Sequence, residues 1–223
     1  MQQNITIMQK NVETTAYRKE LRRRIMDLAM DLFRRRGIRQ VKMDDIATAL
    51  SVSKRTLYEI YENKEVLLYE GIVREHEAYR QELATYVEQQ HPSVMDVLLL
   101  FYRNHVEEFG KACPDFFADL KRYPMVQDFF VKEEAHNKEN ARRFFLRGIE
   151  EGYFRDDVNY DIVTRVSEIG IKGTMESNMF SEYSLSEIFS NMIMTFFRGI
   201  CTPKGLEILE SYALTNAGKP SFR

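Results

Sequence analysis

Apolar residues recur at helical spacing along almost the whole chain. From Leu21 to Phe33 they fall at positions i, i+4, i+7, i+8, i+11 and i+12, which predicts one apolar stripe on a helix of about seventeen residues. Gly37 then ends this helix, because glycine readily adopts the left-handed conformation that follows a helix. The apolar-polar alternation of strands is nowhere sustained, so the chain is predicted to be all-α.

The same spacing predicts further helices, with capping residues or proline at their ends. Ser53 and Asn63 are suited to accept hydrogen bonds from free N–H groups at helix starts. Proline costs least at helix boundaries, where Pro92, Pro114 and Pro203 lie. The predicted segments are 43–50, 54–61, 64 into the eighties, 94–110, 114–122, 126–152, 160–180, 185–198 and 204–214.

Composition excludes several classes of protein. The longest apolar run, Val97–Tyr102, is too short to cross a bilayer, and residues 1–10 lack the apolar stretch of a secretory signal. The two cysteines, Cys113 and Cys201, lack metal-ligand spacing and are expected to be reduced thiols in a cytoplasmic protein. No metal or cofactor site is predicted.

The charge is divided unevenly along the chain. The net charge of −2 argues against binding to a polyanion, but residues 1–62 hold 13 basic and 8 acidic side chains, a net charge of +5. Residues 63–223 hold 19 and 26, a net charge of −7. A basic head on an acidic body indicates that only the head meets nucleic acid.

Residues 43–61 have the spacing of a helix-turn-helix, whose second helix can lie in the major groove of DNA. In this second helix Leu57 and Tyr61 are four residues apart and are expected to face inward. Lys54, Arg55 and Tyr58 then project outward, where they can contact phosphates or base edges. The alternative is a solvated basic helix, since helix-turn-helix geometry also occurs in proteins that never touch DNA.

These positions resemble a known family. The pattern Ile46-Ala47-x-x-Leu50-Ser51-Val52-Ser53-x-x-Thr56-Leu57-Tyr58-x-x-Tyr61-x-Asn63-Lys64-Glu65-x-Leu67 resembles the N-terminal domain of TetR-family regulators. The resemblance covers about residues 20–68. Outside these residues the chain agrees with the family in length, in helical content and in short segments such as 148–156.

Residues 1–17 are polar and poorly patterned and are expected to form a flexible tail. The resemblance implies a homodimer with a three-helix DNA-binding domain, over 18–65, and a helical ligand-binding and dimerisation domain, over 66–223. Residues 1–17 are a disordered tail or an arm that contacts phosphates. Lys64, a cation beside free N–H groups at a helix start, also suits a phosphate, although it can equally be an ordinary exposed lysine. The candidate DNA-binding residues are Lys42, Ser53, Lys54, Arg55, Thr56, Tyr58 and Lys64.

Three positions depart from the usual family pattern. Ser51 replaces the turn glycine and can reach the left-handed conformation only at some cost. Lys42 stands where a threonine often begins the second helix, so it cannot cap in the same way but can reach a phosphate. Ile60 replaces a Tyr or His and removes one expected contact with the DNA backbone. The DNA contacts are therefore expected to be similar in kind to those of the family but not identical.

The remainder of the chain has no catalytic signature. The chain as a whole is rich in Phe, Tyr and Met, with 15, 12 and 11 residues respectively. Each of these residues can simply be helical core, but such a bundle can also hold an adaptable apolar pocket. The resemblance implies a pocket between helices near residues 98–130 and 168–180. The candidate lining residues are Tyr102, His105, Phe116, Phe117, Tyr123 and Met175.

The last two long helices are candidates for a dimer contact, with small residues such as Gly170 permitting close approach. The alternative is a helix pair within one chain. The candidate interface residues are Ile162, Val166, Ile169 and Gly173 on one helix and Ile188, Met192, Thr195 and Phe196 on the other. A symmetric dimer would place two recognition helices roughly 34 Å apart on a palindromic operator.

The leading hypothesis is a repressor that an apolar or aromatic small molecule releases from DNA. A second is a regulator of the same fold that responds to a protein partner or to no ligand. A third, a helical enzyme that uses His105 with a nearby carboxylate, lacks any paired catalytic spacing.

Overall fold

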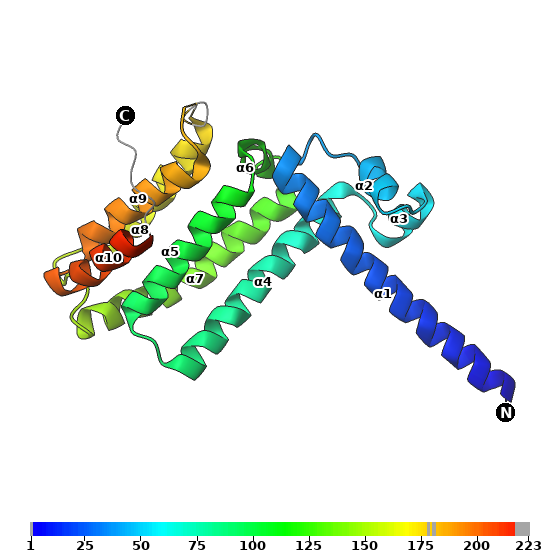
Figure 1. The fold of residues 1–223 in the computed structure, drawn as a ribbon, viewed down its shortest axis with the longest axis horizontal. Coiled ribbons are helices and arrows are strands. Elements are labelled where there is room, and N and C mark those ends of the chain that lie inside the picture. Colours follow the sequence, from blue (N-terminus) through cyan, green and yellow to red (C-terminus); the bar gives the residue numbers. More distant parts are fainter. Residues whose placement is uncertain (1, 178, 180–181, 217–223) are drawn as a thin grey trace. The chain divides into compact units, whose positions relative to one another are not determined.

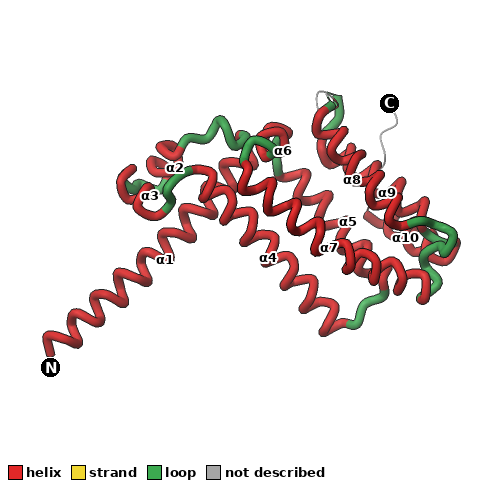
Figure 2. The backbone as a smooth tube through the Cα atoms, turned by 180° about the vertical axis from the view of Figure 1, so that it is seen from behind, coloured by secondary structure: helices red, strands yellow, loops and turns green. Residues whose placement is uncertain are grey.

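The computed structural model describes residues 2–177, 179 and 182–216 of the 223-residue chain. Within these residues the chain is helical and contains no β-strand, as predicted, and its loops join helix to helix (Figure 2). An isolated antiparallel bridge links Phe154 to Cys201. The helices labelled in Figure 1 are α1 (Gln2–Arg36), α2 (Met43–Ala49), α3 (Lys54–Ile60), α4 (Lys64–Gln90), α5 (Val94–Lys111), α6 (Pro114–Leu120), α7 (Pro124–Glu150), α8 (Tyr160–Glu176), α9 (Leu185–Ile200) and α10 (Pro203–Asn216).

Helix α1 is longer than the sequence analysis predicts. Residues 1–17 are expected to form a flexible tail, whereas α1 begins at Gln2. The side chains from Ala16 to Glu20 are all exposed, and burial begins at Leu21. Among the side chains of α1 whose burial is described, packing into the core therefore begins at Leu21. Before that point the helix continues because each added residue gains a hydrogen bond once a helical turn already exists.

The chain folds into two compact units, and the first consists of residues 1–79 together with 115–129. In this unit α1 contacts α2 and α3, around a core that includes Phe33, Ile46, Leu57 and Leu67, each fully buried. Burial of such a side chain contributes about 1.5–3 kcal/mol. Ion pairs also join α1 to α4: Arg22–Glu70, Asp27–Arg74 and Arg34–Glu75.

Residues 115–129 belong to the first unit although they lie far along the sequence. Asp119 of α6 is buried, and its Oδ2 accepts a hydrogen bond of 2.8 Å from the Arg39 backbone N–H. Gly37 has a φ of +83° and lies against α6. A Cβ atom at Gly37 would be only 2.8 Å from the Asp115 Cβ atom, so no larger residue fits there. The predicted domain boundary between residues 65 and 66 therefore differs from the observed division, because α6 packs against the loop after α1.

The second unit consists of residues 80–114 and 130–223, of which the described part is built on α5, α9 and α10. Its core includes Met95 of α5 and Phe189 of α9, both fully buried. The Phe154 ring packs where a side chain at Gly148 would otherwise lie, since a Cβ there would be 1.9 Å from the ring. The Thr202 backbone N–H donates to the Tyr153 carbonyl at 2.9 Å, which joins the end of α7 to the start of α10.

Candidate nucleic-acid interface

The turn between α2 and α3 contains a strained residue at the position where the family pattern has glycine. Ser51 has φ of +56°, as the sequence analysis expects of a residue in this turn. The Ser51 N–H donates to the Thr48 carbonyl at 3.0 Å, and the Val52 N–H donates to the Ala47 carbonyl at 3.0 Å. These bonds close the turn and so determine how α3 leaves α2.

Ser53 holds the start of α3. Its Oγ accepts a hydrogen bond of 3.0 Å from the Thr56 backbone N–H, and the two hydroxyl oxygens lie 2.8 Å apart. The prediction that Ser53 caps this helix is confirmed. Both side chains are candidates for DNA contact, and in this structure both also stabilise the first turn of α3.

Buried anchors fix which face of α3 points outward. Leu57 is fully buried and Tyr61 is 1% exposed, as their four-residue spacing predicts. Tyr58 on the other side is 49% exposed, and Thr56 is half-buried. Burial raises the pKa of Tyr61 to about 12, so its hydroxyl remains protonated at neutral pH.

Arg22 of α1 supports the end of α3, a role that the sequence analysis does not identify. Its guanidinium donates to the Ile60 carbonyl at 2.9 Å, pairs with Glu70 and lies 4.5 Å from the centre of the Tyr61 ring. The Tyr61 hydroxyl in turn donates to the Arg22 carbonyl at 3.4 Å. From the sequence, the arginines of α1 predict only a polar helix face. They do not indicate which arginine contacts α3.

The two cations at the start of α3 are exposed and paired with carboxylates. Lys54 is 67% exposed and pairs with Asp44 of α2. Arg55 is 89% exposed, and its Nε lies 2.8 Å from Glu59 Oε1 one turn later. Each carboxylate raises the pKa of its partner by hydrogen bonding to the charged form.

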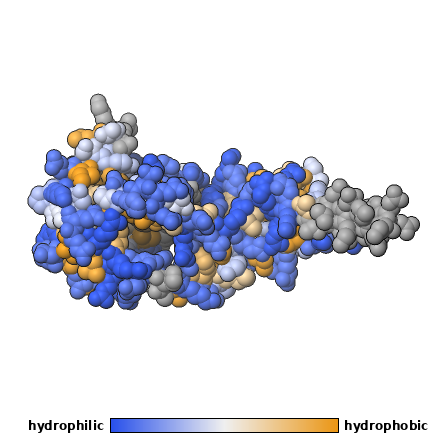
Figure 3. All heavy atoms as spheres, turned by 90° about the horizontal axis from the view of Figure 1, so that it is seen from below, coloured by the Kyte–Doolittle hydropathy of each residue, from blue (hydrophilic) through white to orange (hydrophobic). Residues whose placement is uncertain are grey.

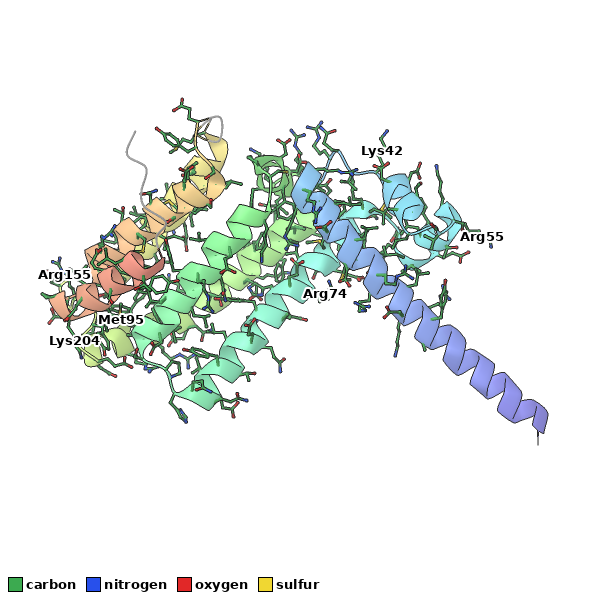
Figure 4. All side chains as sticks on the ribbon, viewed as in Figure 1. Lys42, Arg55, Arg74, Met95, Arg155 and Lys204 are labelled. Carbon is green, nitrogen blue, oxygen red and sulfur yellow. The ribbon has the colours of Figure 1, made fainter. Side chains whose placement is uncertain are left out.

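Lys42 precedes α2 and is exposed. Its backbone N–H donates to Asp45 Oδ2 at 2.8 Å, so the acid three residues later caps this helix start. Lys42 and Arg55 both lie at the periphery of the α2–α3 region (Figure 4). The Lys42 side chain is therefore open to solvent, and its contact with a phosphate stays a prediction.

Lys64 lies at the start of α4, where Asn63 Oδ1 accepts a hydrogen bond of 3.0 Å from the Val66 N–H, so the predicted cap is confirmed. The Lys64 ammonium donates to the carbonyls of Ile38 and Val41, each at 2.8 Å. Burial lowers its pKa. Lys64 is thus not simply an exposed lysine: it joins the start of α4 to the loop between α1 and α2.

The candidate ligand residues are divided between the two compact units of the chain. Tyr102 and His105 belong to the second unit, where the Tyr102 hydroxyl lies 2.7 Å from Ser190 Oγ. The Tyr102 ring also contacts the rings of Phe197 and Tyr212, with centroids 6.4 and 6.0 Å away. His105 stacks on Phe101 with centroids 3.8 Å apart, and its Nδ1 lies 2.9 Å from the Phe101 carbonyl.

Phe116, Phe117 and Tyr123 belong instead to the first unit. Phe116 is 4% exposed and packs edge-on against Phe117, with the Arg34 guanidinium 5.8 Å from its ring centre. Burial raises the pKa of Tyr123. The side chain of Met175 lies outside the described residues. The spacing of residues in the sequence does not show how the chain divides into units. It therefore could not assign the candidate ligand residues to one unit or the other.

The two predicted dimer stripes differ in exposure. On α8, Ile162, Val166 and Ile169 are 60%, 50% and 64% exposed, and the position of a Cβ at Gly173 has no neighbour within 4 Å. Apolar patches are also visible on an otherwise mostly hydrophilic face of the molecule (Figure 3). The α8 stripe is therefore available for contact.

The α9 stripe is largely used within the chain. Ile188 is 8% exposed, so its side chain packs within its own chain, as in the alternative of an intramolecular helix pair. Met192 and Phe196 are half-buried, and a Cβ at Gly170 of α8 would lie 3.5 Å from the Met192 sulfur. Thr195 is exposed, and its hydroxyl donates to the Asn191 carbonyl of its own helix. The close approach expected at Gly170 thus occurs between α8 and α9 of one chain.

Among the described residues, no group of three or more His, Cys, Asp and Glu side chains has an arrangement that could hold a metal ion. None of the described helices combines the length and apolar character needed to cross a membrane.

Comparisons with known proteins support the interpretation of the α2–α3 region. Residues 25–70 match the model of the tetR family of bacterial regulatory proteins. Among curated proteins, none matches the sequence of this chain.

Several solved structures share the fold over most of the chain. A transcriptional regulator from Saccharomonospora viridis in complex with choline is 18% identical, with a TM-score of 0.66 over 82% of this chain and 99% of its own. Regulatory protein TetR from Rhodobacter sphaeroides is 15% identical, with a TM-score of 0.60 over 80% and 97%. A gamma-butyrolactone receptor is 16% identical, with a TM-score of 0.58 over 90% and 100%.

The family model and the solved structures cover different parts of the chain. The N-terminal helix-turn-helix matches the family model, and the helical fold that follows is also found in family members. Residues 25–70 of the chain are therefore similar to the DNA-binding part of the tetR family, and the chain shares its helical fold with these solved structures.

Proposed function

We propose that this protein is a TetR-family transcriptional regulator, a homodimeric repressor that binds a palindromic DNA operator through α3 and is released from it by a small apolar or aromatic ligand. The observation that carries the proposal is the outward face of α3. Lys54, Arg55 and Tyr58 are exposed there, while Leu57 and Tyr61 hold the opposite face in the core. Such a helix can enter the major groove with its polar side chains toward base edges.

The exposed stripe of α8 supports the dimer. Ile162, Val166 and Ile169 would cost free energy if they stayed in water, and burial against a second copy of α8 removes that cost. A twofold dimer matches a palindromic operator, because each recognition helix then meets the same half-site. Size-exclusion chromatography with light scattering should give twice the 26.4 kDa of one chain, and Val166→Glu should shift the mass toward one chain.

The aromatic cluster of the second unit supports a ligand. Tyr102, Phe197 and Tyr212 lie together there, and similar solved proteins include one in complex with choline and one that is a gamma-butyrolactone receptor. A ligand that prefers a conformation unable to bind DNA shifts the population away from the DNA-bound form. A thermal-shift screen tests this step, because a specific ligand raises the melting temperature. No response across a broad library of apolar and aromatic compounds would favour regulation without a small molecule.

The DNA-binding part is tested by electrophoretic mobility shift with DNA fragments from around the protein's own coding region. Selective binding that weakens steeply with salt is the expected result, since phosphate contacts release counterions. Equal affinity for every fragment, or no affinity at low salt, would contradict the proposal.

A further inference from the structure

The helix-turn-helix itself is slightly acidic, although the N-terminal part of the chain is basic. Between Lys42 and Glu62 the chain has three basic side chains and four acidic ones, a net charge of −1. Residues 1–41 have ten basic and four acidic side chains, so the net positive charge of residues 1–62 comes entirely from this part. The surface that would read DNA therefore does not attract a polyanion by its own net charge.

Two of these acidic side chains form ion pairs with the basic side chains of α3. Asp44 pairs with Lys54 across the turn, and Glu59 pairs with Arg55 along α3. Asp44 and Glu59 are 46% and 50% exposed, so both carboxylates are on the outer surface with the cations. A DNA backbone that approaches Lys54 or Arg55 therefore also approaches a negative charge.

Neither acid is needed to build the helix pair. Ser53 caps α3, Leu57 anchors it, and Asp45 rather than Asp44 caps the start of α2. Exposed ion pairs of this kind contribute little to folding, because solvent screens them and the long side chains lose conformational freedom. The positions of Asp44 and Glu59 thus call for an explanation in binding rather than in stability.

We propose that Asp44 and Glu59 are specificity-determining residues that weaken binding to non-operator DNA more than binding to the operator. This inference rests on the proposed function, in which α3 reads the operator. On any duplex Lys54 and Arg55 can exchange their carboxylate partners for phosphates, but the carboxylates then remain beside the phosphates and repel them. Only the operator adds base-edge hydrogen bonds, such as a bidentate contact from Arg55 to guanine, that offset this repulsion.

The test uses the full-length protein and two duplexes of equal length, one selected by the protein from a randomised library and one with the same bases scrambled. Asp44→Asn and Glu59→Gln each keep the size of the side chain but remove its charge. The matched control is Asp31→Asn, because Asp31 and Arg35 on α1 form an exposed ion pair of the same i to i+4 type as Arg55 and Glu59, at 2.9 Å, with exposures of 47% and 71%. Binding is measured by fluorescence anisotropy at several salt concentrations, and far-ultraviolet circular dichroism checks that each variant is folded.

The proposal predicts that each neutral variant binds the scrambled duplex about 2- to 5-fold more tightly, the range expected from exposed ion pairs. Affinity for the selected duplex should change less, so the ratio between the two duplexes falls, while Asp31→Asn leaves that ratio unchanged. Equal tightening on both duplexes, or the same change in Asp31→Asn, would show a general effect of charge and overturn the proposal. A Glu59→Gln variant that loses only operator affinity would overturn it for Glu59, which would then be a base-contacting residue.

The selection step separates this inference from the proposed function. If the wild-type protein enriches no sequence from the library, the proposed operator binding fails. If it enriches one and the neutral variants keep the wild-type ratio, the proposed function stands and the role given to Asp44 and Glu59 fails.

Discussion

The Arg22 guanidinium of α1 lies 4.5 Å from the centre of the Tyr61 ring, at the residue that ends α3. Through this contact and the hydrogen bond to the Ile60 carbonyl, α1 holds the C-terminal end of the recognition helix. The orientation of α3 therefore depends on a residue that lies 38 positions before Ile60 in the sequence.

Replacement of Arg22 by alanine should destabilise the first unit. The variant loses a hydrogen bond, a cation–π contact and a half-exposed ion pair, which together predict a loss of about 1–2 kcal/mol in the free energy of unfolding. Urea denaturation followed by circular dichroism measures this loss. Arg24→Ala, at an exposed position of the same helix, is the control, and equal stability of the two variants would refute the assigned role.

The positive φ of Ser51 makes a prediction about the turn. Ser51→Gly removes the backbone strain, so the free energy of unfolding should stay the same or rise by about 0.5 kcal/mol. Ser51→Val should lower the free energy of unfolding by about 1–2 kcal/mol. The order Gly, Ser, Val in melting temperature is the expected result of differential scanning fluorimetry. A valine variant as stable as the glycine variant would show that this residue does not hold a left-handed conformation.

Asp119 provides a test of the contact between α6 and the loop after α1. Asp119→Ala leaves the Arg39 N–H without its acceptor in a buried place, which predicts a loss of about 1–3 kcal/mol. Asp119→Asn keeps an oxygen acceptor and should lose less. Amide hydrogen exchange at residues 37–41 should rise in the alanine variant, and unchanged protection there would count against the contact.

Two glycines of the second unit should respond oppositely to alanine. A Cβ at Gly205 would lie 2.4 Å from the Tyr153 carbonyl oxygen, so Gly205→Ala should destabilise the protein by about 2–4 kcal/mol. A Cβ at Gly199 in α9 meets nothing within 4 Å, so Gly199→Ala should stabilise the helix by about 0.5–1 kcal/mol. Thermal melts that rank Gly205→Ala above Gly199→Ala would contradict the packing of the segment after Cys201.

Local features of the sequence predicted much of the fold. Spacing alone indicated the helices, the caps at Ser53 and Asn63 and the inward positions of Leu57 and Tyr61, since each of these depends on neighbours within one or two turns. The left-handed turn at Ser51 followed instead from the resemblance, because Ser51 stands where the family pattern has a turn glycine.

Long-range partners were not predictable in the same way. Nothing near Lys64 in the sequence indicates that its ammonium meets the carbonyls of Ile38 and Val41, and nothing near Asp119 indicates the Arg39 N–H. The packing partner of Ile188 was open for a similar reason, because an apolar stripe does not reveal whether its partner is in the same chain or in another.

The most direct test of the account compares two exposed arginines of the same unit in binding to the selected duplex. Arg55, on α3, and Arg35, on α1, each pair with a carboxylate one turn away and are 89% and 71% exposed. If α3 reads the operator, Arg55→Ala should weaken binding by about 10-fold or more and relax the sequence preference, as expected for loss of a base contact worth about 1–3 kcal/mol. Arg35→Ala should retain both affinity and preference. Equal, small effects of the two substitutions would contradict the central claim that α3 is the element that reads DNA.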